Sequence, residues 1–140
     1  MAELISREVD YAIRIVAYLA GQKEKVKIKD ICDKLYISKP IAIKIINKLK
    51  KHNILNTLTG KNGGIELNTD VEKLSLYDIL SYMDYVPVFN VCVDKPSICK
   101  LNPICKITTF FKEIQDKIVY NLLEAKVKEF IFKDEDLEKV

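Results

Sequence analysis

Apolar residues recur at every third or fourth position in several stretches of the chain, and this spacing predicts amphipathic helices. The first stretch covers residues 7–21, where Gly21 is a favourable stop, and the second covers residues 27–35. The third begins at Ser38, a favoured residue just before a first helical turn, and runs to about residue 52. Its predicted core face carries Ile41, Ile45, Ile46 and Leu49.

The pattern changes after the third helix. The segment "ILNTLTGKNGGIELN" contains two short β-rich runs around "TGKNGG", which is a strong turn signal. The order of helix, short helix, capped basic helix and hairpin is that of a winged helix-turn-helix. In that architecture we expect the third helix to lie in the DNA major groove, with the hairpin tip reaching the backbone or the minor groove.

The second half of the chain contains a short helix from near Ser75, an irregular segment and a long helix. The long helix has little of its own chain to cover its apolar face, so we expect it to pair with a second copy; an intrachain core helix is the alternative. The predicted fold is therefore mainly α with a small β-hairpin wing. It comprises a winged helix-turn-helix over residues 1–85, a cysteine-rich loop over 86–106, a dimerisation helix over 107–132 and a frayed tail over 133–140.

Composition indicates a globular protein, because 49% of the 140 residues are apolar and 31% are charged. The N-terminal "MAELISREVD" is not a signal peptide and no apolar run is long enough to cross a bilayer, so we expect a cytoplasmic protein without a membrane partner. Net charge is only +3, yet residues 34–65 hold seven lysines and no acidic residue. This unopposed positive block favours double-stranded DNA as a partner, with a solvated lysine face as the alternative.

The positive block supplies the candidate DNA-binding residues. Its lysines would provide affinity for phosphates, and its small apolar side chains could touch thymine methyl groups, which favours an A·T-rich site. A two-fold dimer would read a palindromic operator. The candidates are Ser38, Lys39, Pro40, Ala42, Ile43, Lys44 and Lys48 on the third helix, and Thr59, Lys61 and Asn62 in the wing.

Three of the four cysteines, Cys92, Cys99 and Cys105, lie in "VCVDKPSICKLNPICK" with the spacing C-x6-C-x5-C. In a reducing compartment such a group indicates a metal or redox site more than a structural disulfide. Thiolates are soft ligands that suit iron–sulfur clusters. Zinc, which usually takes closer CxxC pairs, and a thiol–disulfide switch are the alternatives. Cys32, on the inner face of the second helix, is expected to be a core residue.

These motifs resemble the family of small bacterial winged-helix regulators that includes IscR, NsrR and CymR. The resemblance covers almost the whole chain and depends on "SREVDYAIRIVAYLA", "ISKPIAIKIINKLKKHNIL", "LTGKNGGIELN", "LSLYDILSYMD" and the three cysteines ahead of a long helix. It implies a homodimeric transcription factor, not an enzyme, whose DNA affinity responds to an iron–sulfur cluster through redox, nitric oxide or cluster status. Some members hold no cluster, so a cofactor-free repressor with a thiol–disulfide switch is the alternative. The wing departs from the common form, because Thr59 stands where many members carry an arginine.

Three thiolates leave one cluster position for another ligand. In IscR-like members this ligand is a histidine three residues after the third cysteine, where this chain has Thr108; its lone histidine, His52, ends the third helix. NsrR-like members use a carboxylate from the first helix of the partner subunit. The matching position is Asp10, with Glu8 as runner-up, although an acid in a first helical turn is also favoured by the helix dipole alone. The resemblance thus favours a [4Fe–4S] cluster over a [2Fe–2S] cluster.

Overall fold

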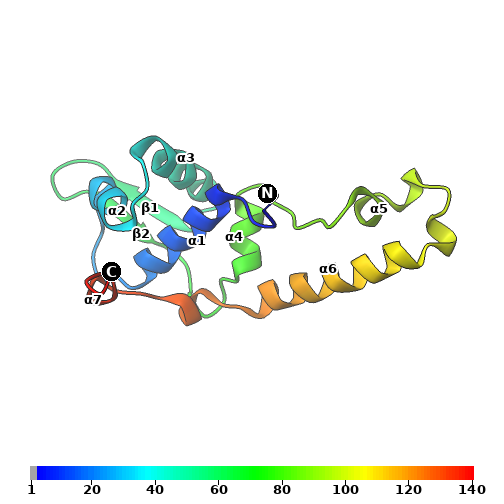
Figure 1. Ribbon diagram of the computed structural model, residues 1–140. Coiled ribbons are helices and arrows are strands. Elements are labelled where there is room, and N and C mark those ends of the chain that lie inside the picture. Colours follow the sequence, from blue (N-terminus) through cyan, green and yellow to red (C-terminus); the bar gives the residue numbers. More distant parts are fainter. Residues whose placement is uncertain (1–2) are drawn as a thin grey trace.

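A computed structural model describes residues 3–140, so Met1 and Ala2 of the predicted N-terminal unit lie outside the described residues. Figure 1 shows a compact body and an arm that projects from it. The predicted fold class is confirmed, since the chain is mainly helical with one antiparallel hairpin. The body contains α1 (Arg7–Ala20), α2 (Ile28–Leu35), α3 (Lys39–Lys50), β1 (Leu55–Leu58), β2 (Gly64–Leu67) and α4 (Leu76–Tyr82).

Helix α1 lies at the centre of the body, where it packs against α3, α4 and β2. Its apolar residues follow the three-four spacing, and Ala12, Ile15 and Val16 are completely buried. Side chains cap two of the four body helices. Ser6 accepts a hydrogen bond from the backbone N–H of Val9 at the start of α1, and a reciprocal capping box precedes α4. The body helices therefore begin within a residue or two of their predicted starts.

The buried face of α3 matches the prediction at Ile45, Ile46 and Leu49 but contains Ala42 in place of Ile41. Ala42 is completely buried, whereas Ile41 is 37% exposed. Residue 42 shares one helical face with Ile45, Ile46 and Leu49, and each single step along a helix turns the side chain by about 100°. The prediction that Ala42 contacts DNA is therefore wrong, because its methyl group belongs to the core.

The wing is a hairpin in which Leu55 pairs with Leu67 and Leu58 pairs with Gly64. It is fixed to the body by two backbone hydrogen bonds of 2.9 and 2.8 Å between Val26 and Ile65. The turn between the strands requires glycine, since a Cβ atom at Gly63 would lie 2.2 Å from the carbonyl oxygen of Leu58. The wing tip therefore has a defined backbone path next to the start of α2.

The arm consists of a linker that folds back along α6 (Lys106–Glu124), with α5 (Val91–Asp94) and the 3-10 helices η1 (Pro96–Ile98) and η2 (Asn102–Ile104) at its distal end. The ring centroids of Phe89 in the linker and Phe111 in α6 lie 5.5 Å apart. The Phe89 N–H donates to Gln115 Oε1 at 2.8 Å. Within residues 3–140, neither α6 nor any other helix has the length and apolar character needed to cross a membrane.

The long helix ends at Glu124, whereas the prediction carried it to residue 132, so this part of the prediction is wrong. The chain leaves the helix because residues 125–127 pair with the segment before α4. Leu76 N–H donates to Ala125 O, and Val127 N–H donates to Leu74 O, both at 2.9 Å. Val127 is then buried in the body core, where it is only 1% exposed, and this burial replaces two further helical turns.

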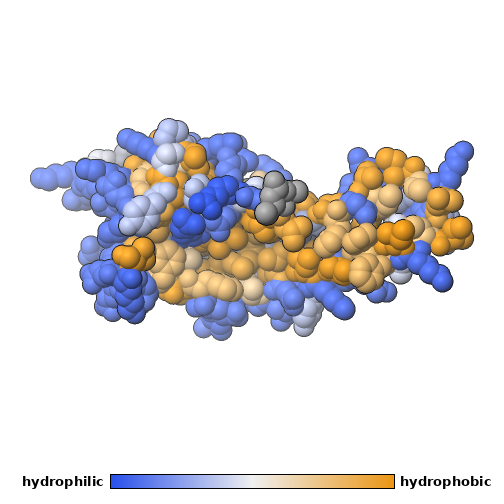
Figure 2. All heavy atoms as spheres, viewed as in Figure 1, coloured by the Kyte–Doolittle hydropathy of each residue, from blue (hydrophilic) through white to orange (hydrophobic). Residues whose placement is uncertain are grey.

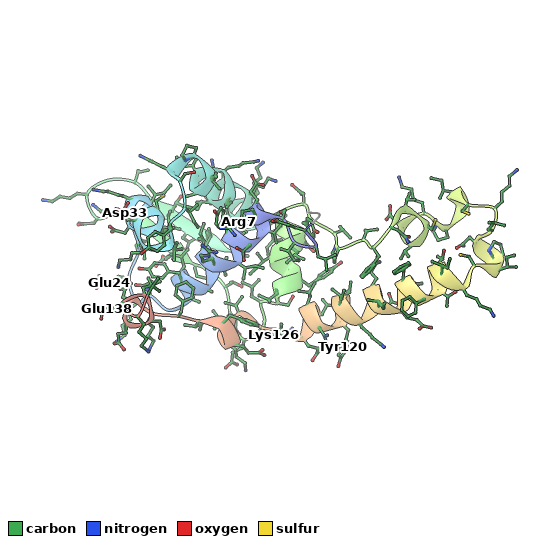
Figure 3. The ribbon with its side chains drawn as sticks, in the orientation of Figure 1. Arg7, Glu24, Asp33, Tyr120, Lys126 and Glu138 are labelled. Atoms are coloured by element: carbon green, nitrogen blue, oxygen red, sulfur yellow. The ribbon has the colours of Figure 1, made fainter. Side chains whose placement is uncertain are left out.

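The predicted frayed tail is also incorrect, because the chain returns to the body and forms 3-10 helix η3 (Val127–Phe130) and then α7 (Asp134–Leu137). The ring of Phe132 lies 5.7 Å from that of Tyr18, measured between centroids. Tyr18 Oη donates to Asp134 Oδ1 at 2.8 Å, and Lys34 Nζ donates to the same oxygen at 3.0 Å. Figure 3 shows Glu138 of the tail at the same end of the body as Glu24, just beyond α1.

Candidate nucleic-acid interface and thiol site

The solvent-exposed side of α3 carries most of the predicted DNA-binding residues. Ser38 occupies the position before the first helical turn, and Lys39 and Pro40 follow it on the exposed surface. Ile43 is 40% exposed, which is unusual for an isoleucine beside a well-packed core. The N-terminal half of α3 thus presents positive charge and small apolar surface to solvent, and these residues stay predictions as DNA contacts.

Two predicted DNA-binding lysines meet acidic groups of their own chain. Lys44 Nζ lies 2.5 Å from Glu8 Oε1 on α1, and Lys48 Nζ lies 3.7 Å from Asp84 Oδ2 just beyond α4. Surface ion pairs of this kind contribute little stability, so a phosphate group can compete with either acid. One side of α3 is therefore partly neutralised by the body itself.

The wing tip presents Thr59, Lys61 and Asn62, and all three are exposed. Leu58, just before them, is also 58% exposed. In the part of the chain that the structure describes, no acidic group forms an ion pair with Lys61. The tip is thus a positively charged projection on the side of the body that also exposes α3.

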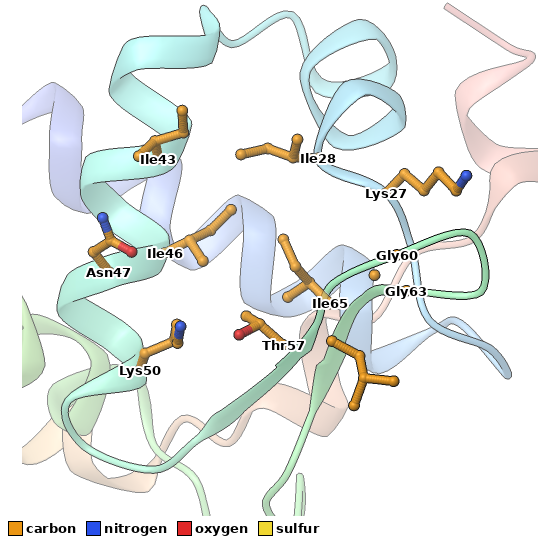
Figure 4. Close-up of a pocket in the computed structure, with 12 residues that line it drawn as sticks. Lys27, Ile28, Ile43, Ile46, Asn47, Lys50, Thr57, Gly60, Gly63 and Ile65 are labelled. Atoms are coloured by element: carbon orange, nitrogen blue, oxygen red, sulfur yellow. The ribbon is translucent and has the colours of Figure 1, made fainter.

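A cleft with a volume of about 380 Å³ separates α3 from the wing (Figure 4). Asn47 and Lys50 line it from α3, Thr57 lines it from β1, and Lys27 lies at the start of α2 beside the wing loop. None of these four residues was among the predicted DNA contacts. Helical spacing could have identified Asn47, because it follows Ile43 by one turn on the same face.

The three clustered cysteines lie at the distal end of the arm, on α5 and around η1 and η2. Cys92, Cys99 and Cys105 are free thiols and each is partly exposed. Hydrogen bonding from the hydroxyl and N–H of Thr108 lowers the pKa of the Cys105 thiol. Cys32 instead packs against the core from α2, as predicted, and burial raises its pKa.

The donor chemistry of this loop fits an iron–sulfur cluster, since three thiols of one short segment are free to act as soft ligands. The single chain does not bring them into a closed set. Among the described residues, no group of three or more histidine, cysteine, aspartate or glutamate side chains is close enough to hold a metal ion. To form one metal-binding site, the three thiols therefore need a change in the conformation of the loop or a further ligand from another chain.

Asp10 is not near the thiols of its own chain, because α1 lies in the body and α5 at the far end of the arm (Figure 1). Its Oδ2 atom accepts a hydrogen bond from Arg14 Nη2 at 3.0 Å. The other nitrogen of that guanidinium, Nη1, donates to the carbonyl oxygen of Leu35 at 3.3 Å. Asp10 is thus connected through Arg14 to the last residue of α2.

A family model named Rrf2, described as an iron-dependent transcriptional regulator, matches residues 5–133. An HTH-type transcriptional regulator NsrR from Shouchella clausii is 28% identical over 134 residues, which cover 91% of this chain and 88% of that protein. The NsrR regulator of Bacillus licheniformis is 33% identical over 107 residues, covering 72% and 73%. The solved structure of CymR, the global cysteine regulator of B. subtilis, matches 91% of this chain and 95% of its own with a TM-score of 0.68. At 16% identity that structural match supports the fold alone.

Proposed function

This chain belongs to the Rrf2 family of transcriptional regulators, and on that premise we propose that it is a homodimeric repressor whose affinity for a palindromic operator responds to an iron–sulfur cluster. It is a DNA-binding regulator and not an enzyme. The observation that carries the cluster proposal is the group of three free, partly exposed thiols at the tip of the arm, in a chain that matches an iron-dependent family.

Cys92, Cys99 and Cys105 would hold the cluster, and the [4Fe–4S] form is favoured over [2Fe–2S]. Such a group supplies a redox-active centre that reacts with small molecules, including nitric oxide. The loop assists because its 3-10 turns and prolines let the chain bend around a compact ligand, which a straight helix cannot do. The distal position of the loop also leaves its sulfur atoms open to small reactants.

DNA binding is assigned to α3 and the wing. The exposed residues from Ser38 to Lys44 would enter the major groove, and Lys61 would reach the neighbouring backbone or minor groove. Within residues 3–140 Lys61 in the wing forms no ion pair, and Lys44 and Lys48 of α3 form only weak surface pairs, which supports this assignment. Two copies related by a two-fold axis would present two such surfaces, which is why the operator should be palindromic.

The fourth ligand is proposed to be Asp10 of the partner subunit, with Glu8 as the runner-up. Because α1 lies in the body and the cysteine loop lies at the distal end of the arm, a second copy would provide the carboxylate. Within one chain, Arg14 donates hydrogen bonds both to the Asp10 carboxylate and to the carbonyl oxygen of Leu35 at the end of α2. If the Asp10 carboxylate served as the fourth ligand, it would release the Arg14 guanidinium, which lies beside the turn between α2 and α3. Whether Asp10 is a ligand or not can therefore bias the position of α3, the proposed DNA-reading helix.

The proposal is tested by purifying the protein without oxygen and recording its visible absorption and native mass. We expect a brown protein whose mass includes iron and sulfide, and we expect both signals to be lost in Cys92→Ala. Cys32→Ala is the matched control and should keep both, because that thiol packs against the core. A colourless wild type that takes up no iron after anaerobic reconstitution would refute the cluster assignment.

A cofactor-free repressor with a thiol–disulfide switch is the second candidate. It is favoured by one observation, that the described chain does not gather its thiols into a closed ligand set. The same purification separates the two candidates, because this repressor would be colourless and would lose free thiols on mild oxidation together with a change in DNA affinity. Zinc would be recognised in the native mass spectrum by its mass without sulfide.

A further inference from the structure

We propose that the cleft between α3 and the wing receives the sugar–phosphate backbone of the operator, with Lys27 and Lys50 as its phosphate-binding groups. This inference rests on the proposed function, because it takes α3 and the wing as the DNA-binding elements. A helix in the major groove and a hairpin tip in the adjacent minor groove lie on opposite sides of one DNA strand. The backbone of that strand must therefore pass between the helix and the hairpin, where the cleft lies.

The charges around the cleft favour an anion. Among the described residues, Lys27 and Lys50 are the charged groups that line it, and no carboxylate does. Across residues 3–140, neither lysine takes part in an ion pair, whereas Lys44 and Lys48 on the other side of α3 already meet Glu8 and Asp84. Lys39, Lys51 and Lys61 also form no ion pair among the described residues, but Lys27 and Lys50 are the unpaired lysines that line the cleft, and a phosphate there would meet positive charge that no acid neutralises.

The uncharged lining suits the rest of a nucleotide backbone. Asn47 on α3 and Thr57 on β1 face the cleft from opposite walls and can donate hydrogen bonds to phosphate oxygens (Figure 4). Gly60 and Gly63 carry no side chain where the wing loop borders the cleft, so a DNA strand can approach the protein backbone at these two positions.

Two exposed apolar residues that line the cleft would also contact the DNA backbone in this mode of binding. Ile43 is 40% exposed and Leu58 is 58% exposed, and both line the cleft. The cleft lining is mostly apolar, with Lys27 and Lys50 as its charged groups, and the carbon face of a deoxyribose ring would cover the exposed apolar side chains. Lys27, Lys50, Asn47 and Thr57 are therefore assigned as DNA-backbone contacts in addition to the predicted ones.

Lys27→Ala and Lys50→Ala test the proposal. Each should weaken binding to a duplex selected from a random pool by the wild type, and to unrelated duplex by a similar factor, because phosphate contacts carry no base information. The slope of log K against log salt should fall by about 0.9 for each phosphate that the variant no longer neutralises in each half-site. Lys29→Ala and Lys51→Ala are matched controls, since these exposed lysines lie on or just beyond the same helices but outside the cleft.

A neutral methylphosphonate placed at each phosphate of the selected duplex provides a second measurement. We expect one position per half-site where the substitution weakens wild-type binding and has almost no further effect on Lys50→Ala. Equal weakening by the cleft variants and their controls, or no such coupled phosphate, would overturn the cleft assignment. If Lys44→Ala and Lys61→Ala weaken binding while the cleft variants do not, only this inference fails. If the wild type binds no duplex at all, the proposed function fails with it.

Discussion

At the scale of single residues, one carboxylate holds the C-terminal end of the chain against the body. Tyr18 is completely buried, and its hydroxyl reaches Asp134 on α7, which also accepts a hydrogen bond from Lys34 on α2. The hydrogen bond from Lys34, followed by that from Tyr18, lowers the pKa of the Asp134 carboxyl. Burial, followed by the bond to Asp134, raises the pKa of the Tyr18 hydroxyl. One ionised carboxylate thus connects α7 to both α1 and α2.

The lowered pKa of Asp134 predicts how stability depends on pH. Its charged form contributes stability that is present above the ordinary carboxyl pKa and is lost as pH falls through the lowered folded value. Asp134→Asn should therefore lower the urea midpoint near neutral pH by an amount equivalent to about 0.5–1 kcal/mol, the upper part of the range for exposed pairs. The difference from wild type should shrink as pH falls below the ordinary aspartate pKa of about 3.9 and towards about pH 3. Glu135→Gln, at an exposed neighbouring position, is the control, and its stability relative to wild type should not change with pH in this way. A loss of stability in Asp134→Asn that is equal at neutral pH and at about pH 3 would contradict a stabilising role for the ionised Asp134 carboxylate.

At the scale of elements, α6 is a long helix that the folded chain covers only in part. None of its nineteen residues is buried, and Ile107 and Phe110 are 66% and 57% exposed. Figure 2 shows apolar surface continuing along the arm. Such an area is large for an isolated chain in water, and a second copy offers an identical stripe that can cover it around a two-fold axis. This is the physical basis of the proposed homodimer.

The double substitution Phe110→Asp with Ile114→Asp tests this pairing. The two side chains are four residues apart on one face of α6, so the new charges would be buried together in a dimer and solvated in a monomer. We expect sedimentation to give a dimer for the wild type at about 20 µM and a monomer for the double variant. Lys112→Asp places a charge on an exposed polar position of the same helix and should leave the dimer intact. A wild type that sediments as a monomer under these conditions would exclude the proposed interface.

At the scale of the whole molecule, the arm separates the thiols from the body. The cysteine loop lies at the distal end of the arm and α1 lies in the body, so a ligand set that joins Cys92, Cys99 and Cys105 to Asp10 would have to span two chains. This geometry makes assembly a condition for the proposed cluster site. In the proposed dimer the loop of one subunit would also act on the DNA-binding body of the other, since Asp10 is linked through Arg14 to α2.

Mixed dimers test the contribution of Asp10 across subunits. In the first, one subunit carries Asp10→Ala and the other lacks the three loop cysteines, so the remaining cluster faces an intact partner carboxylate. In the second, both changes are in one subunit, so the remaining cluster faces a partner without the carboxylate. We expect the wild-type absorption spectrum and nitric oxide reactivity in the first dimer and altered values in the second. Identical behaviour of both dimers would show that Asp10 is an ordinary surface acid, and the reverse result would place the ligand within one chain.

Several features of the fold and of the candidate site could be predicted because they depend on neighbours in sequence. The spacing of apolar residues identified the body helices, and "TGKNGG" identified the wing turn. The three cysteines were visible as a group because one short segment carries them. The same reasoning misjudged Ala42, because an alanine and an isoleucine side by side fit the helical period almost equally well. It missed Lys27 and Thr57 because they meet α3 only after the chain has folded.

The amino-acid sequence by itself determined the body helices, the hairpin and the donor chemistry of the loop, since periodicity, capping and turn residues act over a few positions. Only the tertiary structure decided where the long helix ends and what the tail does. Residues 125–132 keep a helical apolar pattern, yet pairing with the segment before α4 and burial of Val127 are more favourable than two exposed turns of helix. Tertiary contacts also decided which lysines are free and which are paired, because Glu8, Asp84 and Asp134 lie far along the chain from the lysines they meet. Interactions between distant segments form only when the whole core closes, so no local pattern can encode them.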